Sequence, residues 1–331
     1  MKRLLQVHIT DKCNLRCKHC YQEGMNRSSV MDIESFTLLM NQFDDLLTLP
    51  DSEGKVMNIT GGEPLIIPNI FDYIDIAMNS GVERINLLTN GILFNKDNLL
   101  KIKSRDNIIE TQVSLEGPEE INDKIRGKGS FKKIIQGIKL AKDLGLYIKV
   151  SCTLNDLNYS FVDETIDIVK ESGADMIWFD RMTPFNEDII KGLSTEQFVF
   201  AMNKIKNAKI KYATCNNFKI LTKRALQFLF CLDEEINGYK CAAIVKNFSI
   251  FPNGSVYACP RLPIKLGNFK ETSLIDIYHS EKAQELLKII TSVPNECRKC
   301  DFQNNCLGGA RCITYVNSGC LDKGDVNCLI R

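Results

Sequence analysis

The sequence predicts an α/β fold whose parallel strands form an open sheet or a curved partial barrel. As far as Phe179, short apolar segments alternate with longer amphipathic ones. The apolar segments are rich in Val, Ile and Leu, as strands buried on both faces are. Six β–α units in succession need crossover connections, and such connections make the strands parallel.

The individual elements follow from this alternation. Six segments are predicted to be strands: Leu4–Thr10, Lys55–Thr60, Arg84–Thr89, Ile109–Leu115, Tyr147–Thr153 and Met176–Phe179. Amphipathic segments between them are predicted to be helices: Asp32–Leu47, Ile70–Asn79, Phe131–Leu144 and Asp163–Ser172. Glycines, which commonly end helices, follow three of these: Gly81, Gly145 and Gly173.

The pattern changes in the second half of the chain. Leu193–Lys240 is predicted to be helical and rich in lysine, and Leu274–Ile290 to be one amphipathic helix. Ser249–Phe251 and Ser255–Ala258 flank an Asn-Gly turn and indicate a β-hairpin. The cysteine-rich end has few apolar runs, so something other than burial must hold it together. We therefore expect three parts, 1–192, 193–240 and 241–331.

Composition limits the location and the partners. The formal net charge of the 331 residues is +1, which favours neither nucleic acid nor an anionic membrane as a partner. No segment approaches the ~20 apolar residues of a membrane span, and the N-terminus lacks a signal-peptide core. A cytoplasmic location is expected, where 14 cysteines favour metal ligation or catalysis over disulfides. One basic stretch predicts a solvated helix face or, alternatively, a dock for an acidic partner: Lys204, Lys206, Lys209, Lys211, Lys219, Lys223 and Arg224.

Three cysteines, Cys13, Cys17 and Cys20, follow the first predicted strand. Active sites of parallel α/β folds form at this edge of the sheet. A structural zinc needs four protein ligands, and His19 lies awkwardly between two of the cysteines for the fourth. Three thiolates on a four-iron cluster would instead leave one iron open to a ligand.

This CxxxCxxC spacing resembles the signature of the radical SAM superfamily. The resemblance implies a partial (β/α)6 TIM-like barrel with a small cysteine-rich iron–sulfur domain at its C-terminal end. It also implies a [4Fe-4S] cluster whose open iron binds the amino and carboxylate groups of S-adenosylmethionine (SAM). One electron then cleaves SAM to a 5′-deoxyadenosyl radical, which abstracts hydrogen from a substrate. The alternative is a zinc or purely structural cluster loop.

The ends of the other strands carry small polar residues. Gly61-Gly62-Glu63-Pro64 follows the second strand, where glycines permit close backbone approach and a carboxylate can hold an ammonium group. It resembles the GGEP motif that contacts the SAM amino group in this superfamily. Each of these strand ends, taken alone, is equally typical of an ordinary turn. The alternative for Arg126 is an ion pair at the protein surface. By resemblance, the expected SAM contacts are Tyr21, Gly61, Gly62, Glu63, Asn90, Ser114 and Arg126.

The sixth strand is followed by a charged pair, Asp180 and Arg181. The pair is expected either to touch substrate or to form its own ion pair.

A second field of cysteines lies near the C-terminus. Its spacing resembles the SPASM extension of peptide- and protein-modifying radical SAM enzymes, which carries two auxiliary four-iron clusters. By resemblance, one of these clusters is enclosed by Cys297, Cys300, Cys306 and Cys328. A four-thiolate zinc site has similar spacing and is the alternative.

The other auxiliary cluster has an incomplete set of ligands. Cys241 and Cys259 match the pattern, but Ala310 stands where a cysteine is expected. Cys312 is a possible substitute, with Cys231 and Cys320 as further possibilities, so one or two auxiliary clusters are expected. Cys152 and Cys215 show no partner by spacing and are expected to be buried, inert thiols. His8 and His279 are expected to be structural.

Three functions are compatible with these patterns. The first is hydrogen abstraction from a peptide or protein that matures by a thioether, a carbon–carbon crosslink or an oxidation. It requires an electron donor such as flavodoxin or ferredoxin. Because the first strand begins by Leu4, with no leader-binding domain before it, the peptide is expected to be recognised either by a separate leader-recognition protein or by the barrel and the basic stretch. The second is small-molecule chemistry, for example on a modified tetrapyrrole, and the third is a non-enzymatic, zinc-stabilised interaction protein.

Overall fold

The computed structural model describes residues 1–22, 28–186, 188–222, 225–230 and 240–330. The chain divides into two compact units. The first unit comprises Met1–Asn14, Gln22–Gln112 and Ala242–Lys288, and the second Leu15–Tyr21, Val113–Cys241 and Ile289–Arg331. The division falls inside the strand β4 (Ile109–Ser114).

The first unit is built on strands in the order β10-β9-β8-β1-β2-β3. β1 (Lys2–Thr10), β2 (Gly54–Gly61) and β3 (Arg84–Thr89) are parallel, with Leu5 opposite Met57. β8 (Asn247–Ile250) adds to β1 in parallel, and β9 (Ser255–Cys259) and β10 (Leu262–Asn268) continue antiparallel. The predicted hairpin is confirmed, whereas β10 was not predicted.

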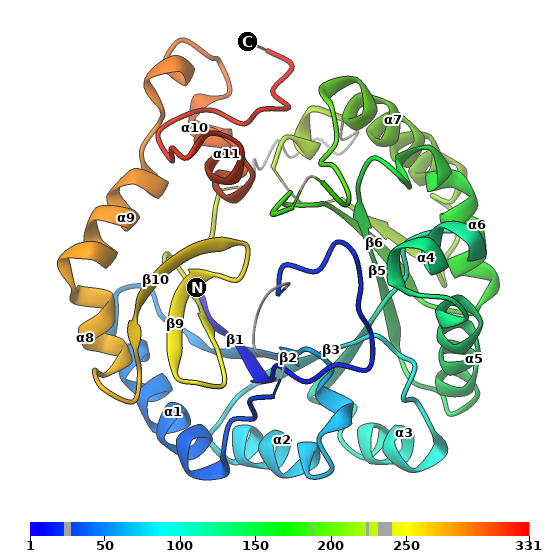
Figure 1. Ribbon diagram of the computed structural model, residues 1–331, viewed down its shortest axis with the longest axis horizontal. Coiled ribbons are helices and arrows are strands. Elements are labelled where there is room, and N and C mark those ends of the chain that lie inside the picture. The colour runs from blue at the N-terminus through cyan, green and yellow to red at the C-terminus, as the bar shows by residue number, and fades with distance from the viewer. Residues whose placement is uncertain (23–27, 187, 223–224, 231–239, 331) are drawn as a thin grey trace. The chain divides into compact units, whose positions relative to one another are not determined.

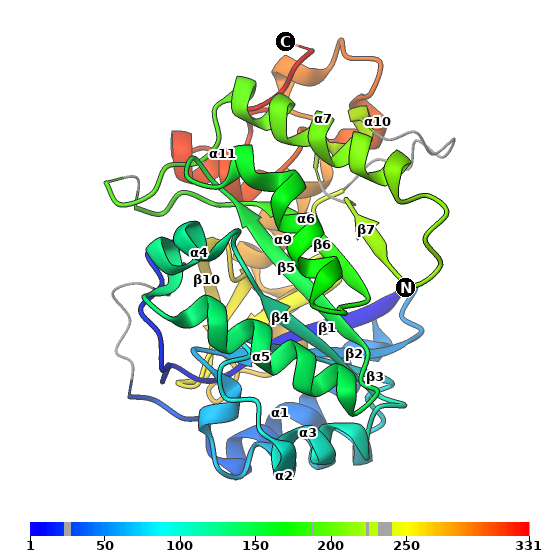
Figure 2. The same cartoon turned by 90° about the vertical axis from the view of Figure 1, so that its right-hand side faces the viewer.

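Three helices cover one side of β1–β3 (Figures 1 and 2): α1 (Ile33–Asp45), α2 (Ile70–Asn79) and α3 (Lys96–Lys103). The side chain of Asp32 caps α1 by accepting a hydrogen bond from Ser35 N. Phe36, Leu39 and Phe43 recur at helical spacing on its buried face, and each contributes about 1.5–3 kcal/mol by burial. The helices thus fix the strands whose ends carry the predicted site.

The second unit holds strands in the order β4-β5-β6-β7: β5 (Ile148–Leu154), β6 (Met176–Arg181) and β7 (Lys219–Leu221) run parallel to one another. Figures 1 and 2 show α4 (Glu119–Arg126), α5 (Ser130–Asp143) and α6 (Val162–Glu171) on one side of β5 and β6. α7 (Thr195–Lys211) packs against α6. The C-terminal segment of this unit contributes α10 (Gln303–Cys306) and α11 (Arg311–Ser318). The 3-10 turns are η1 Leu46–Thr48, η2 Pro64–Ile66, η3 Tyr159–Phe161, η4 Gln227–Phe230 and η5 Asn295–Cys297.

All six predicted strands are confirmed to within a few residues at their ends, and so are the four helices predicted between them, which are α1, α2, α5 and α6. α3 and α4 were not predicted. The single helix predicted over Leu274–Ile290 is wrong, because α8 (Leu274–His279) ends at Ser280 before α9 (Glu281–Thr291) begins. Ser280 has extended backbone with ψ of 148°, and its hydroxyl accepts a hydrogen bond from Ala283 N. A capping serine therefore interrupts an otherwise continuous apolar periodicity.

The lysine-rich segment is helical only in part, since β7 and η4 follow α7 in it. Lys204 and Lys211 pair with Asp163 and Asp167 of α6 at 2.8 and 3.3 Å. These contacts support a solvated helix face rather than a dock, while Lys223 and Arg224 lie outside the described residues. None of the helices in the described ranges combines the length and apolar character of a membrane span.

Candidate cofactor and auxiliary-cluster sites

In the first unit, the Glu63 carboxylate ties the end of β2 to the end of β3. Its side chain is fully buried. Oε1 accepts hydrogen bonds from Thr89 Oγ1 at 2.7 Å and from Leu65 N, and Oε2 accepts one from Asn90 N at 2.7 Å. Glu63 therefore fixes the geometry of two strand ends.

Gly61 and Gly62 allow the start of the cysteine loop to lie against the end of β2. A Cβ atom on Gly61 would lie 2.4 Å from Thr10 O, and one on Gly62 would lie 2.2 Å from Lys12 O. Gly62 N donates to Thr10 O at 2.7 Å, and Glu63 N donates to Lys12 O at 2.8 Å. The two glycines thus let two backbone segments pack closely. The segment that packs against them here is the start of the cysteine loop.

Asn90 extends this framework to the residue after Cys13. Its Nδ2 donates to Asn14 Oδ1 at 2.7 Å, and its Oδ1 accepts from Ile92 N. Asn14 Oδ1 also lies 3.9 Å from Cys13 Sγ, and Cys13 itself is half-buried. In the first unit, then, a network that begins at Glu63 reaches the beginning of the cysteine loop.

The second unit holds the rest of that loop. Cys20 N donates to Cys17 O at 3.2 Å, and Lys18 N donates to Ile125 O of α4 at 2.9 Å. The imidazole of His19 lies against the Glu116 carboxylate, with 3.2 Å between Nε2 and Oε1, and its Nδ1 atom is buried without a protein partner. His19 therefore interacts with the Glu116 carboxylate.

Glu116 is the centre of a buried ionic cluster. Its Oε1 accepts from Arg126 Nη2 at 2.5 Å and Nε at 3.1 Å, while Oε2 accepts from Thr153 N at 2.8 Å. Burial by itself would raise the pKa of Glu116, but the guanidinium of Arg126 and the imidazole of His19 lower it to about 2. Arg126 also reaches the cysteine loop, since its Nη1 lies 3.9 Å from Cys17 Sγ. The surface ion pair considered for Arg126 is therefore wrong, because this pair is buried.

A second buried ion pair joins β6 to the C-terminal segment. Arg181 Nη1 and Nη2 donate to the two oxygens of Asp325 at 2.8 and 2.6 Å, and both residues are at most 3% exposed. The sequence left open whether Asp180 and Arg181 touch substrate or pair with each other. In the structure the Arg181 guanidinium pairs with Asp325, and Asp180 Oδ1 accepts a hydrogen bond from the Arg181 backbone N. Asp325 also accepts from Ala310 N at 2.8 Å. Ala310, which stands where a cysteine was expected, thus donates a backbone hydrogen bond to Asp325.

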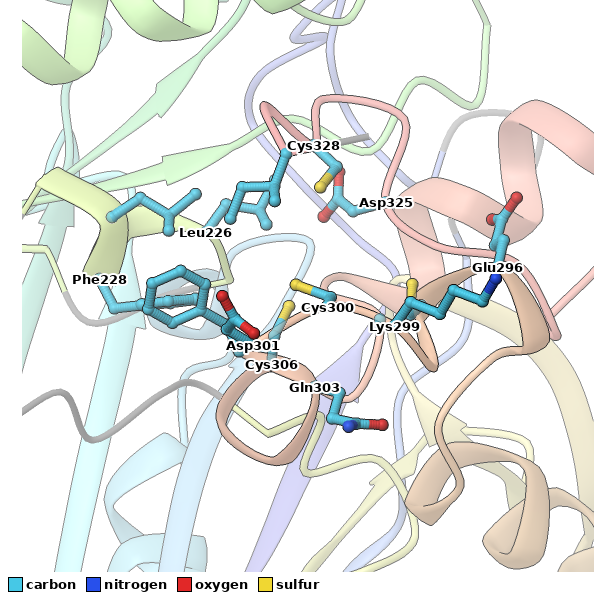
Figure 3. A pocket seen from close by; sticks show the side chains of 15 residues that line it. Leu226, Phe228, Glu296, Lys299, Cys300, Asp301, Gln303, Cys306, Asp325 and Cys328 are labelled. Carbon is cyan, nitrogen blue, oxygen red and sulfur yellow. The ribbon is translucent and has the colours of Figure 1, made fainter.

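Asp325 belongs to the wall of a cavity of about 220 Å³ in the second unit. In Figure 3, the sulfur atoms of Cys300, Cys306 and Cys328 point into this pocket, with Asp325 beside Cys328. A third segment of the unit completes the wall with residues that include Leu226 and Phe228. The four cysteines that the spacing grouped together all line it: Cys297, Cys300, Cys306 and Cys328.

The donor set of this pocket fits an iron–sulfur cluster. Thiolates hold a single zinc at about 2.3 Å, whereas four thiols around a cavity of about 220 Å³ suit a larger group. Within the described ranges, no three His, Cys, Asp or Glu side chains are arranged to hold a single metal ion. Burial raises the pKa of the Cys306 thiol to about 11, with Asp325 and Cys328 adding to it. A positively charged cluster would reverse this effect by stabilising the thiolate.

Arg311 holds the segment that carries these cysteines. Its side chain is fully buried, and its guanidinium donates to backbone carbonyls of Ser292 at 2.6 Å and Leu321 at 2.7 Å. It also donates to the carbonyls of Ile289 and Lys323, at 3.3 and 3.4 Å. The charged side chain thus crosslinks a region with few apolar residues, a function that its position in Leu307–Arg311 did not indicate.

The remaining cysteines divide by burial. Cys312 is buried and accepts a hydrogen bond from Thr183 Oγ1 at 3.6 Å, and Cys152 is buried with a raised pKa because of desolvation. Cys215 is half-buried, so its expected burial is wrong. Cys241 of the second unit, Cys259 at the end of β9 and Cys320 are also half-buried, while Cys231 lies outside the described residues.

Two further predicted contacts and two histidines complete the comparison. Ser114 ends β4 and Tyr21 follows the cysteine loop, each half-buried. His8 is fully buried between Gln22 at 2.7 Å and Ser249 at 3.3 Å, and its ring stacks on Phe251 at 4.3 Å. Its structural role is confirmed, whereas His279 is exposed.

Three residues with clear positions in these sites were missed from sequence: Glu116, Asp325 and Arg311. Glu116 follows a buried strand directly, which is a usable signal for a site residue. Asp325 precedes Cys328 by three residues, and Arg311 precedes Cys312. Neither position indicates burial, because charged residues are buried only where a distant partner meets them.

Comparison with known proteins agrees with this geometry. Residues 7–155 match the family model of the radical SAM superfamily, and residues 241–301 match that of SPASM, an iron–sulfur cluster-binding domain. The AdoMet-dependent heme synthase of Methanosarcina barkeri is 25% identical, over 99% of this chain and 97% of its own. The subtilosin biosynthesis protein AlbA of Bacillus subtilis is 27% identical, over 91% of this chain and 65% of its own.

A solved structure of anSMEcpe with bound AdoMet has a TM-score of 0.81 and 19% identity, and the alignment covers 99% of this chain and 94% of that one. The native form with AdoMet and the Cp18Cys peptide gives a TM-score of 0.80. These similarities confirm the α/β fold with a mostly parallel sheet that forms a partial barrel.

The chain is therefore a radical SAM enzyme with a C-terminal SPASM domain. Its cofactors are SAM and iron–sulfur clusters. The predicted class, fold and cofactors are confirmed, and the interpretation as a non-enzymatic zinc protein is wrong.

Proposed function

We propose that this enzyme abstracts hydrogen from a peptide substrate and forms a thioether, a carbon–carbon crosslink or an oxidised residue. The observation that carries the proposal is the pocket lined by Cys297, Cys300, Cys306 and Cys328. A second cluster there can accept an electron from a substrate radical, which these three outcomes require. AlbA, named for the biosynthesis of a bacteriocin, supports a peptide as the substrate.

Specific residues are proposed for each cofactor. Cys13, Cys17 and Cys20 would hold the [4Fe-4S] cluster that binds SAM and supplies a carbon-centred radical. The four pocket cysteines would hold one auxiliary cluster, and Cys241, Cys259 and Cys312 are proposed for a further one. Residues at the strand ends, in the cysteine loop and at the end of α4 would orient SAM: Tyr21, Gly61, Gly62, Glu63, Asn90, Ser114 and Arg126.

Glu63 and Asn90 would act in this proposal through a fixed framework. Glu63 is fully buried and holds Thr89 and Asn90 by hydrogen bonds of 2.7 Å. Such a network presents the strand ends in one arrangement, so that SAM binds without ordering them first.

The proposal also includes two partner proteins and a cytoplasmic location. An electron donor such as flavodoxin or ferredoxin would reduce the SAM-binding cluster, and a leader-recognition protein would deliver the peptide. The cytoplasm suits this chemistry, because a reducing compartment keeps cysteines available as cluster ligands. The parts 1–192, 193–240 and 241–331 are proposed as barrel, connecting segment and auxiliary domain.

A second candidate substrate is a modified tetrapyrrole. The heme synthase of Methanosarcina barkeri matches this chain over 97% of its own length, which specifically favours it. Ala310 also leaves one complete auxiliary set of cysteines instead of two.

The test compares two cysteine variants in the anaerobically reconstituted enzyme. Cys17→Ala should abolish SAM cleavage, whereas Cys300→Ala should spare cleavage and stop product formation. Cys215→Ala, which removes a half-buried thiol with no proposed ligand role, is the matched control. Products are measured by mass spectrometry with a precursor peptide encoded beside the gene and with a modified tetrapyrrole. Turnover of the tetrapyrrole alone, or full turnover by Cys300→Ala, would overturn the peptide proposal.

A further inference from the structure

Arg126 ends α4 with its guanidinium enclosed by protein. Its side chain is 9% exposed. Nε and Nη2 both donate to Glu116 Oε1, at 3.1 and 2.5 Å, which leaves Nη1 to extend toward the cysteine loop. There it lies 3.9 Å from Cys17 Sγ, within the range of a hydrogen bond to sulfur. The guanidinium therefore bridges a carboxylate and a thiol.

Glu116 holds this guanidinium in one orientation. Its side chain is fully buried, and its other oxygen accepts from Thr153 N at 2.8 Å while His19 lies 3.2 Å from Oε1. Burial alone would lower the pKa of Arg126, but Glu116 raises it, with a smaller contribution from Cys17. The cation beside the thiol is thus permanent and has little freedom to turn away.

We propose that Arg126 is a positioning residue that donates a charged hydrogen bond to the Cys17 sulfur and raises the reduction potential of the SAM-binding cluster. The proposal rests on the proposed function, which makes Cys17 a ligand of that cluster. Hydrogen bonds to the sulfurs and local charge set the potential of an iron–sulfur cluster. A buried cation favours the reduced state, which carries one more negative charge, and burial weakens the screening of that attraction.

Two other roles for Arg126 lead to different measurements. If Arg126 acts only by orienting SAM, as the proposed function has it, its removal weakens SAM binding and leaves the potential of the SAM-free cluster unchanged. If the ion pair of Arg126 with Glu116 only stabilises the fold, removal of Arg126 lowers the unfolding temperature. SAM binding and the potential of the SAM-free cluster then stay unchanged.

The experiment is a redox titration of the reconstituted full chain, monitored by the electron paramagnetic resonance signal that changes when SAM is added. In Arg126→Gln, the reduced-to-oxidised ratio at a fixed potential should fall about tenfold, equivalent to about 59 mV for one electron. Glu116→Gln should raise the ratio, because it removes a negative charge from the same cluster of side chains. Arg126→Lys keeps the positive charge but lacks the planar set of guanidinium donors, so its reduced-to-oxidised ratio should lie between those of Arg126→Gln and the unmodified enzyme.

Arg105→Gln is the matched control, since it breaks a bidentate pair with Asp75 on the surface of the first unit. Its ratio should equal that of the unmodified enzyme. Equal ratios in Arg126→Gln and the unmodified enzyme at equal iron content, or shifts of Arg126→Gln and Glu116→Gln in the same direction, would overturn the proposal. If Arg126→Gln fails to load iron, Arg126→Lys and Glu116→Gln decide by the same criterion.

Cys17→Ala separates this failure from that of the proposed function. If the SAM-responsive signal persists in Cys17→Ala, the ligand assignment fails, and with it the proposed function. If the signal depends on Cys17 and the ratio in Arg126→Gln is unmoved, only the role of Arg126 fails.

Discussion

The second unit contains two cysteine regions that differ in how their thiols are brought together. In the N-terminal loop, Cys17 and Cys20 are three residues apart, and Cys20 N donates to Cys17 O. In the C-terminal pocket, Cys297 and Cys328 are separated by most of the C-terminal segment and still line one cavity. A buried arginine–carboxylate pair accompanies each region, Arg126 with Glu116 and Arg181 with Asp325.

The two ion pairs serve different ends. Arg126 reaches a thiol, whereas Arg181 holds the backbone of the pocket through Asp325, which in turn accepts from Ala310 N. A short loop needs few crosslinks because its ligands are close by sequence. The pocket must oppose the entropy of a longer chain, and charged crosslinks do this where apolar burial is scarce. The pocket should therefore depend more on its charged scaffold than the loop does.

The largest expected effect comes from Asp325→Leu. It leaves the buried Arg181 without its carboxylate, which should destabilise the pocket by about 3–5 kcal/mol. Iron analysis should show loss of the auxiliary iron, while SAM cleavage continues. Arg181→Met combined with Asp325→Leu should recover much of the stability, because it removes both charges. Retention of all iron by the single variant would contradict the scaffold role.

Arg311→Met should have the next largest effect. It leaves the carbonyls of Ser292 and Leu321, among others, without their donor, at a cost of about 3 kcal/mol. The thermal unfolding midpoint and the auxiliary iron content should both fall. Arg298→Met, at an exposed position between Cys297 and Cys300, is the control and should change neither. Similar losses in both variants would point to a general charge effect.

His8 provides a reference outside both cysteine regions. Burial lowers its pKa from 6.5 to about 3, so the unfolded chain binds the proton first as pH falls. The stability that the neutral imidazole contributes is present above pH 6.5 and decreases below it, by about 2 kcal/mol down to pH 5. His8→Gln should reduce the drop in unfolding temperature between pH 7 and pH 5. His279→Gln, at an exposed position, is the control and should leave the fall in unfolding temperature between pH 7 and pH 5 unchanged. An unchanged fall in His8→Gln would contradict the role given to buried, neutral His8.

The smallest effect is expected at the surface pair of Lys204 and Asp163. Both side chains are well exposed, so Lys204→Ala should change stability by less than about 1 kcal/mol. Its unfolding temperature and iron content should match those of the unmodified enzyme. A loss as large as that of Asp325→Leu would remove the distinction between buried and exposed pairs.

The sequence by itself predicted the repeated β–α pattern, the cysteine loop after β1 and the grouping of Cys297, Cys300, Cys306 and Cys328. The first two predictions succeeded because periodicity and loop spacing are local properties of the chain. The third succeeded because the whole C-terminal cysteine pattern resembles the SPASM extension. Tertiary structure alone decided that α8 stops at Ser280, that Arg181 pairs with Asp325 and that Glu116 holds both His19 and Arg126. Burial of a charge depends on a partner that the fold brings from elsewhere in the chain, and no local pattern records that partner.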